Sequence, residues 1–153
     1  MRAVVQRVSQ ASVRVLSQSE GIIASMGEGL LVLLGVGKND SEQDAEYLAE
    51  KILNLRIFPG EDGDMDVSYL DNPNLRILVV SQFTLYGDCR KGRRPSFSNA
   101  AVPLRAEELY EYCITLLRNE GREVLAGRFR TMMDVSLVNS GPVTILLDSK
   151  KEF

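Results

Sequence analysis

Residues 3–15 read AVVQRVSQASVRV, and they alternate apolar and polar side chains in two runs, 3–8 and 11–15. Alternation with a period of two is typical of a β-strand that has one buried face. The polar pair between the runs predicts a short turn, so we expect two strands here. Further apolar runs follow at residues 21–25 and 30–36, after glycine-containing turns. The N-terminal third is therefore predicted to be a β-meander or part of a barrel.

Two later segments have the apolar spacing of amphipathic helices. The first begins near Ser41, where Asp44 three residues later resembles a capping box. The second begins near Pro103, runs to Asn119 and has Gly121 as a natural C-cap. The predicted buried faces consist of Ala45, Leu48, Ala49 and Ile52 in the first helix and Leu109, Tyr112, Cys113, Leu116 and Leu117 in the second.

The remaining apolar runs predict strands at residues 75–80, 123–126, 135–138 and 143–147. Residues 58–74 are rich in Gly, Pro, Asp and Asn, which predicts turns with one short strand around Val67. A chain of 153 residues has room for one core. We therefore expect a single α+β domain over residues 1–153, with a strongly curved, mostly antiparallel sheet or barrel and two main helices packed against it.

The composition is that of an ordinary globular protein, with 44% hydrophobic and 25% charged residues. No apolar run approaches the ~20 residues that a membrane span needs, and the N-terminus has no signal-peptide pattern. We therefore expect a cytoplasmic protein with no membrane partner. In that compartment, Cys89 and Cys113 are expected to be free thiols.

The chain contains no histidine, which excludes several kinds of catalytic site. It has no Ser-His-Asp triad, no Cys-His dyad and no histidine-ligated zinc. The acidic stretch at residues 62–66 lacks the glycine and glutamate of a calcium loop, so we interpret it as a solvated turn and expect no metal or cofactor. An enzyme with this composition needs a general base other than histidine, a substrate that is already activated, or backbone groups that stabilise charge.

A cluster of cations stands out in a chain of net charge −3, and it consists of Arg90, Lys91, Arg93 and Arg94. One interpretation is a solvated surface loop. The other is a local contact with RNA phosphates, whose strength falls as salt is added. The sequence alone leaves both open.

Two short segments carry the functional argument, residues 81–85 (SQFTL) and residues 139–144 (NSGPVT). Taken alone, the first is a strand end with exposed hydroxyls, and the second is a tight turn between two strands. The first can also offer hydrogen-bonding groups beside an aromatic ring on which a base can stack. Proline cannot donate to a sheet ladder, so Pro142 is expected at a strand start or an edge.

Together these segments resemble the motifs of the D-aminoacyl-tRNA deacylase family. The similarity extends over the chain and includes residues 1–8, 29–35 and 54–58. The sequence departs from the family pattern at Arg130-Thr131, where Gly-Ala is usual, and at Ser140, where Asp is usual.

The resemblance implies a homodimeric editing hydrolase that cleaves D-aminoacyl-tRNA, and also glycyl-tRNA mischarged on tRNA-Ala. It implies that Gly141 and Pro142 form a cis bond, enter the other subunit's pocket and exclude L-amino acids. Arg7 would brace this segment, and Gln82 and Thr84 would act in catalysis. The terminal adenosine and attached amino acid would contact the residues Ser81, Phe83, Gly141, Pro142, Arg7 and Met133, and the tRNA phosphates would contact the basic cluster.

Three other interpretations remain. A protein of the same fold can bind RNA without catalysis, a different hydrolase can use the Thr84 hydroxyl on another ester, and the chain can be a purely structural dimer. Competition by tRNA and a deacylation assay with D-tyrosyl-tRNA distinguish them.

Overall fold

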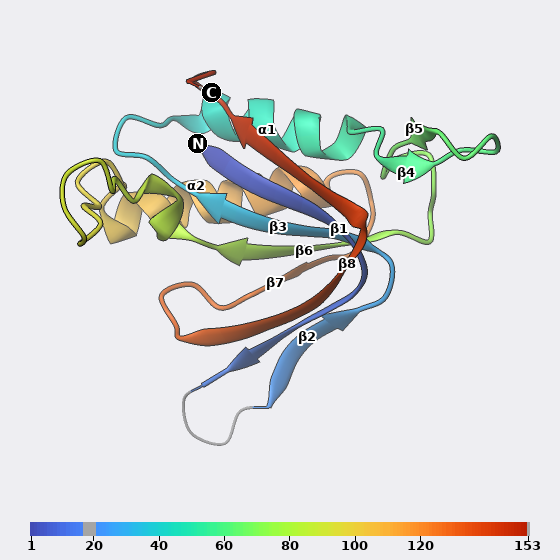
Figure 1. The fold of residues 1–153 in the computed structure, drawn as a ribbon, viewed down its shortest axis with the longest axis horizontal. Coiled ribbons are helices and arrows are strands. Elements are labelled where there is room, and N and C mark those ends of the chain that lie inside the picture. Colours follow the sequence, from blue (N-terminus) through green and yellow to red (C-terminus); the bar gives the residue numbers. More distant parts are fainter. Residues whose placement is uncertain (17–20, 153) are drawn as a thin grey trace.

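A computed structural model describes residues 1–16 and 21–152 of the chain (Figure 1). The helices are α1 (Glu42–Asn54), α2 (Pro103–Arg118) and the short 3₁₀ helix η1 (Phe83–Tyr86). The strands are β1 (Arg2–Val15), β2 (Ile22–Met26), β3 (Gly29–Gly35), β4 (Phe58–Pro59), β5 (Met65–Val67), β6 (Arg76–Ser81), β7 (Val124–Ala126) and β8 (Met133–Asp148).

The main sheet has the order β2-β1-β3-β6-β7, and β8 pairs with β1. All pairings of β1 are antiparallel, but β3–β6 and β6–β7 are parallel. The sheet is thus mixed where we expected it to be mostly antiparallel. The reason is that α1 follows β3 and α2 follows β6, and each helix returns the chain to the end of the sheet where the previous strand began. Small strands β4 and β5 form a separate hairpin.

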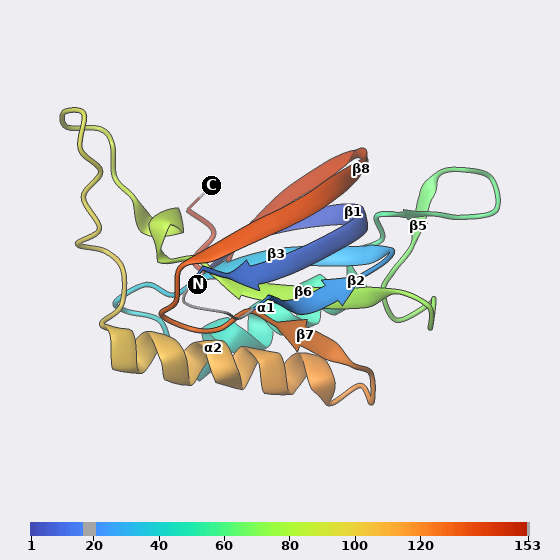
Figure 2. The same ribbon diagram turned by 90° about the horizontal axis from the view of Figure 1, so that it is seen from below.

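Alternate residues of the central strands enter two separate cores. On β3, Leu30 and Leu34 belong to the larger cluster, which the helices cover, and Leu31 belongs to the smaller one. Figure 2 shows both helices on one side of the sheet. The smaller cluster joins β1, β2, β3, β6 and β8 on the other side, and β2 contacts β6 and β7. The sheet therefore curls toward a barrel, as the sequence predicted.

The strongest departure from the sequence-based expectation lies in β1 and β8. Each is one long strand, although the polar residues near Gln10 and Pro142 predicted turns. The two strands pair with each other from Arg2↔Asp148 to Val15↔Met133, with register shifts only around residues 7–10. The polar residues therefore form bulges within a continuous ladder. Figure 1 shows both strands bending at one corner of the sheet.

The helices agree with the sequence, with one rotation. The Ser41 N–H donates to Asp44 Oδ2 over 2.8 Å at the start of α1, and the expected apolar face is buried. In α2, Tyr110 and Ile114 are buried in place of Tyr112 and Leu116, which are only partly covered. The Tyr112 hydroxyl instead donates to the Glu46 carboxylate on α1 over 2.8 Å. The buried face of α2 is therefore rotated slightly from the predicted one.

Both cysteines are free, as expected; Cys89 is exposed and Cys113 is buried. Burial raises the pKa of the Cys113 thiol to about 12, so it behaves as an inert core side chain. Among the described residues, no helix is both long enough and apolar enough to cross a membrane.

Candidate active site

The segment at residues 81–85 leaves the sheet in a defined way. Ser81 is the last residue of β6 and pairs with Leu34 of β3, and the Gln82 N–H donates to the Leu34 carbonyl over 2.8 Å. The chain then turns directly into η1. Gly35 makes this turn possible, because a Cβ at that position would lie 2.9 Å from the Gln82 carbonyl oxygen. As a result, Phe83 and Thr84 are held at the surface.

The Thr84 hydroxyl accepts a hydrogen bond from the Gln82 side-chain amide. An amide cannot take up the hydroxyl proton at neutral pH, so this contact orients Thr84 without activating it as a nucleophile. The hydroxyl keeps its own proton for donation to a ligand. The pair is thus a small hydrogen-bonding unit on an open surface, next to the Phe83 ring.

Beneath η1 lies a supporting network that the sequence analysis did not identify. Arg2 donates to the Leu85 carbonyl over 3.3 Å, and its guanidinium lies 4.7 Å from the centre of the Tyr86 ring. The Tyr86 hydroxyl donates to Asp40 over 3.1 Å, and burial together with the Asp40 charge raises the pKa of Tyr86. A Cβ at Gly37 would lie 2.7 Å from the Tyr86 ring. The glycine at this position is the sequence feature that could have signalled the close contact.

The basic cluster lies on a loop beside η1. An antiparallel bridge between Asp88 and Ser96 closes the loop. Arg90 does not extend freely, because it donates to both carboxylate oxygens of Asp88 over 2.9 and 2.6 Å. These bonds lower the pKa of Asp88. The other three cations, Lys91, Arg93 and Arg94, are exposed.

The segment around Gly141 and Pro142 projects from the edge of the sheet. Arg7 pairs with Val143 and Val8 pairs with Asn139, so residues 140–142 have no partner on β1. The Asn139 side-chain amide bridges this bulge by donating to the Arg7 and Val143 carbonyls over 2.9 and 2.8 Å. The Gly141–Pro142 peptide bond is cis, and both residues are exposed.

Arg7 fixes the base of this bulge. Its Nε donates to the Ser140 carbonyl over 3.1 Å, and a terminal nitrogen donates to the Ile57 carbonyl over 2.5 Å. Gly141 has a φ of +114°, and a Cβ there would lie 2.5 Å from the Arg7 guanidinium. The position therefore requires glycine on two grounds.

Met133 lies with the first segment and not with the bulge. Its sulfur packs where a Cβ at Gly127 would be only 3.0 Å away, and Gly127 hydrogen-bonds to Val79 of β6. The departures from the family pattern lie close by, with Arg130 in a left-handed conformation at a φ of 58° and the Thr131 hydroxyl on the Phe129 carbonyl.

The two predicted halves of the site do not meet in one chain. Ser81 pairs with Leu34, which pairs with Ala3, while the bulge begins at Arg7. Four residues along β1 and three strand spacings across the sheet separate them by on the order of 20 Å. The C-terminal end of β6, marked by its arrowhead, and the bend in β8 lie at opposite ends of the sheet in Figure 1. One chain thus holds two exposed half-sites.

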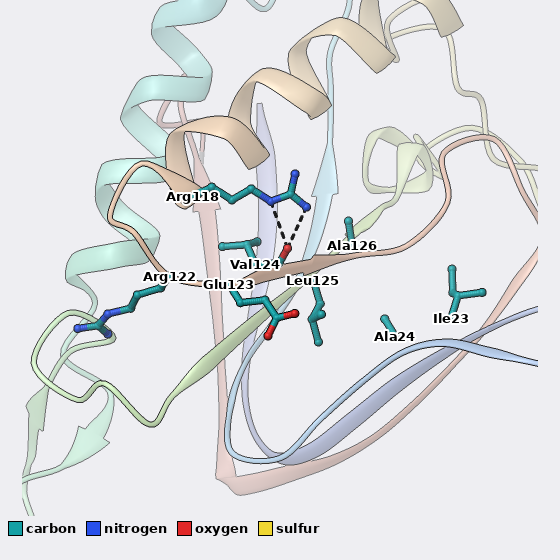
Figure 3. A pocket seen from close by; sticks show the side chains of 8 residues that line it. All are labelled: Ile23, Ala24, Arg118, Arg122, Glu123, Val124, Leu125 and Ala126. Carbon is teal, nitrogen blue, oxygen red and sulfur yellow. Dashed lines mark hydrogen bonds between the residues drawn. The ribbon is translucent and has the colours of Figure 1, made fainter.

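Two hollows of the surface lie elsewhere, along β7. Their volumes are ≈ 410 and ≈ 430 Å³, and they share Ile23 and Ala126. Figure 3 shows the first, where Arg118 donates to the Val124 carbonyl and covers the edge of β7. Neither contains a predicted site residue. Within the described chain, no group of three or more His, Cys, Asp or Glu side chains is arranged to hold a metal ion.

Comparison with known proteins gives concordant results. The model of a family described as D-Tyr-tRNA(Tyr) deacylase matches residues 4–148. Proteins named D-aminoacyl-tRNA deacylase from Thermosipho africanus and Koribacter versatilis are 58% and 60% identical over 153 residues, which is 100% of this chain and of each relative.

Two of the solved structures that match this chain illustrate the shared fold. One, titled "c-Myc DNA Unwinding Element Binding Protein", has a TM-score of 0.87 and 39% identity, and the match covers 97% of this chain and 98% of that one. The other is titled as a probable eukaryotic D-amino acid tRNA deacylase and has a TM-score of 0.83 with 17% identity, over 95% and 97% of the two chains. At that identity, the second shows likeness of fold alone.

Proposed function

Because the chain belongs to the D-Tyr-tRNA(Tyr) deacylase family, we propose that it hydrolyses the ester bond of D-aminoacyl-tRNA and releases a free D-amino acid and tRNA. The observation that carries the proposal is the family match over residues 4–148, within which residues 81–84 present hydrogen-bonding groups and a ring at the surface. We propose that the protein meets this substrate in the cytoplasm. Deacylation of D-tyrosyl-tRNA by the purified protein tests the proposal. D-tyrosyl-tRNA that keeps its ester bond at high enzyme concentration would refute it.

The chemistry suits a chain without histidine. Water attacks the ester carbonyl carbon, the bond to the ribose oxygen breaks, and that oxygen leaves with a proton as the terminal hydroxyl. An aminoacyl ester is already reactive, so correct orientation and donors to the developing oxyanion supply most of the acceleration. The neighbouring ribose hydroxyl assists the water. Gln82 and Thr84 then act by holding the ester, which agrees with the amide-to-hydroxyl bond between them.

We propose further that the working site is shared by two copies of the chain. In a homodimer, the bulge at Gly141 and Pro142 from one copy enters the surface formed by Ser81, Phe83 and Met133 of the other. The separation of these half-sites within one chain supports this arrangement, as does the exposure of the bulge. Arg7 supports it as well, because it holds the bulge from below and leaves its outer surface open.

The same bulge accounts for the choice of the D-amino acid. A rigid backbone wall can exclude the side chain of an L residue more strongly than a pocket can attract a D residue, since one small apolar group contributes only ~1–3 kcal/mol. The bulge is rigid because Asn139 and Arg7 hold both of its ends by hydrogen bonds.

Glycine has no side chain for such a wall to exclude. Glycyl-tRNA, including glycine mischarged on tRNA-Ala, should therefore be hydrolysed as well. The measurement is the rate of loss of glycyl-tRNA relative to D-tyrosyl- and L-tyrosyl-tRNA. Hydrolysis of the D-aminoacyl substrate with complete protection of glycyl-tRNA would contradict exclusion by a wall alone.

Nucleic-acid binding without catalysis is the second candidate. The structural match at 39% identity to a protein titled as a DNA-unwinding-element-binding protein favours it, as do the exposed cations Lys91, Arg93 and Arg94. The candidates differ in turnover: a binding protein protects D-tyrosyl-tRNA from spontaneous hydrolysis or leaves its rate unchanged, and a deacylase shortens its lifetime at substoichiometric concentration.

A further inference from the structure

The phenylalanines Phe83 and Phe97 are exposed and lie against each other. The fractional exposures are 57% and 36%, and the ring centres are 5.0 Å apart in an edge-to-face arrangement with an angle of 67°. No other phenylalanine in the described ranges is exposed. The sequence motif accounts for Phe83 but gives Phe97 no role. Because the ring planes are inclined, a single base cannot lie on both, and each ring can face a different one.

Phe97 is held in place by the backbone on both sides of it. Two hydrogen bonds between Asp88 and Ser96, of 2.8 and 2.9 Å, precede it, and the Lys38 N–H donates to the Asn99 carbonyl over 2.9 Å after it. The Phe97 ring packs against Gly87, where a Cβ would lie only 3.1 Å from Phe97 Cε1. The ring is thus part of a built surface and not a side chain left on a free loop.

Residues 88–96, which the bridge between Asp88 and Ser96 closes into a hairpin, carry the positive charge of this region. Arg90 is bound to Asp88 and strengthens the base of the hairpin. Lys91, Arg93 and Arg94 lie at its exposed end, and no ion pair involves them within residues 1–16 and 21–152. In Figure 2 this hairpin, coloured olive to yellow, stands out from the body of the molecule. Cations along a strand path and aromatic faces for its bases are the two components of single-stranded nucleic-acid sites.

We propose that Phe97 and the hairpin bind the unpaired 3′ end of RNA upstream of its terminal nucleotide. A base stacks on the Phe97 ring, and the phosphates before it contact Lys91, Arg93 and Arg94. The inference rests on the proposed function, because it extends the path of the substrate outward from Phe83 and Thr84. It adds a subsite that recognises the RNA and does not touch the ester.

Two substrates separate this subsite from the catalytic surface. D-Tyrosyl-tRNA reaches the hairpin, and D-tyrosyl-adenosine, which ends at the terminal nucleoside, does not. Phe97→Leu keeps apolar bulk beside Gly87 and removes the ring. We expect kcat/KM on D-tyrosyl-tRNA to fall about tenfold through KM, and kcat/KM on D-tyrosyl-adenosine to stay unchanged.

The cations are tested by their salt dependence. Changing Lys91, Arg93 and Arg94 together to Gln should weaken tRNA binding. The slope of log(kcat/KM) against log salt concentration should become shallower by about two. A control variant with the same change in charge carries Gln at the exposed positions Arg14, Lys51 and Lys151 and should keep the wild-type slope.

Several outcomes would overturn the subsite. One is an equal fall in kcat/KM of Phe97→Leu on D-tyrosyl-tRNA and on D-tyrosyl-adenosine, which would make Phe97 a support for η1 alone. Another is an unchanged kcat/KM on both substrates. Equal competition by single-stranded DNA and RNA of the same sequence would remove the assignment to RNA. If the wild-type protein hydrolyses neither substrate, the proposed function fails, and the anisotropy of a labelled RNA with a 3′ terminal adenosine still tests the subsite: loss of binding in Phe97→Leu supports it and unchanged binding refutes it.

Discussion

The Thr84 hydroxyl accepts a hydrogen bond from the Gln82 amide, and no general base contacts it in the described part of the chain. Nucleophilic catalysis by a hydroxyl needs a neighbouring group that removes its proton. The side chain is therefore suited to orienting an ester, and the nucleophile in our proposal is water. The difference between these roles is measurable.

Thr84→Ala should lower the single-turnover rate of D-tyrosyl-tRNA hydrolysis by about 10- to 100-fold, because one hydrogen bond to a group that gains charge contributes about 1.5–3 kcal/mol. Thr84→Ser keeps the hydroxyl and should retain most of the rate. Mass spectrometry of the quenched wild-type reaction should show no acylated protein. An alanine variant as inactive as a nucleophile deletion, together with an acyl group on Thr84, would establish covalent catalysis instead.

Substitution of Gly141 tests whether the shape of the bulge matters for activity. Gly141→Ala adds a methyl group at a φ of +114° and 2.5 Å from the Arg7 guanidinium. Gly63→Ala is a matched control, because Gly63 also has a positive φ of +83° but has open space around it. Both should lose about 1 kcal/mol of unfolding free energy from the backbone. Only Gly141→Ala should also lose deacylation activity. Equal activity in the two variants would show that the contact with Arg7 does not matter.

Residues that act through their neighbours in the sequence could be predicted, and residues that act across the fold could not. Residues 81–85 and 139–144 could be singled out from the sequence because each is a contiguous segment. Arg2 and Asp40 contact η1 from positions far along the chain, and no local pattern signals such a contact. The separation of the two segments in space was likewise invisible before strand pairing was known.

At the scale of elements, β1 and β8 show where reading by local pattern fails. Polar residues between two apolar runs predict a turn when each run is considered alone. Here β1 and β8 pair on both sides of these polar residues, so hydrogen bonds across the sheet keep the strand direction and the polar residues bulge outward. That tertiary pairing turns Gly141 and Pro142 from a connection into a projection.

Helix α1 carries a pH-sensitive contact at its first turn. Asp44 is buried, and burial alone would raise its pKa, but hydrogen bonds from Lys150, Ser149 and Ser41 outweigh that effect and hold the pKa below its ordinary value of 3.8. A carboxylate with a lowered pKa stabilises the folded state above its unfolded-state pKa and loses that contribution as the pH falls below it.

Asp44→Asn should therefore lower the free energy of unfolding at pH 7 by about 2 kcal/mol and flatten its decline below about pH 4. Urea denaturation at several pH values measures both effects. Asp62→Asn, in an exposed turn, serves as the control and should change neither. A loss for Asp44→Asn that persists unchanged at pH 2 would show that the charge is not the cause.

At the scale of the whole molecule, the central feature is the division of the site. The surface with Phe83 and Thr84 lies at one end of the sheet, and the bulge with Gly141 lies at the other. Within one chain the two cannot hold the same small substrate. In a symmetric dimer, each copy would supply both halves, and two complete sites would form.

Mixing two inactive variants tests this division most directly. Phe83→Ala damages only the surface, and Gly141→Ala damages only the bulge. After the two proteins are unfolded together and refolded, half of the dimers carry one copy of each variant. In those dimers one site receives both substitutions and the other receives neither, so deacylation of D-tyrosyl-tRNA should recover to about a quarter of the wild-type rate. A mixture no more active than either variant refolded alone would show that each chain works with its own two segments, contradicting the shared site.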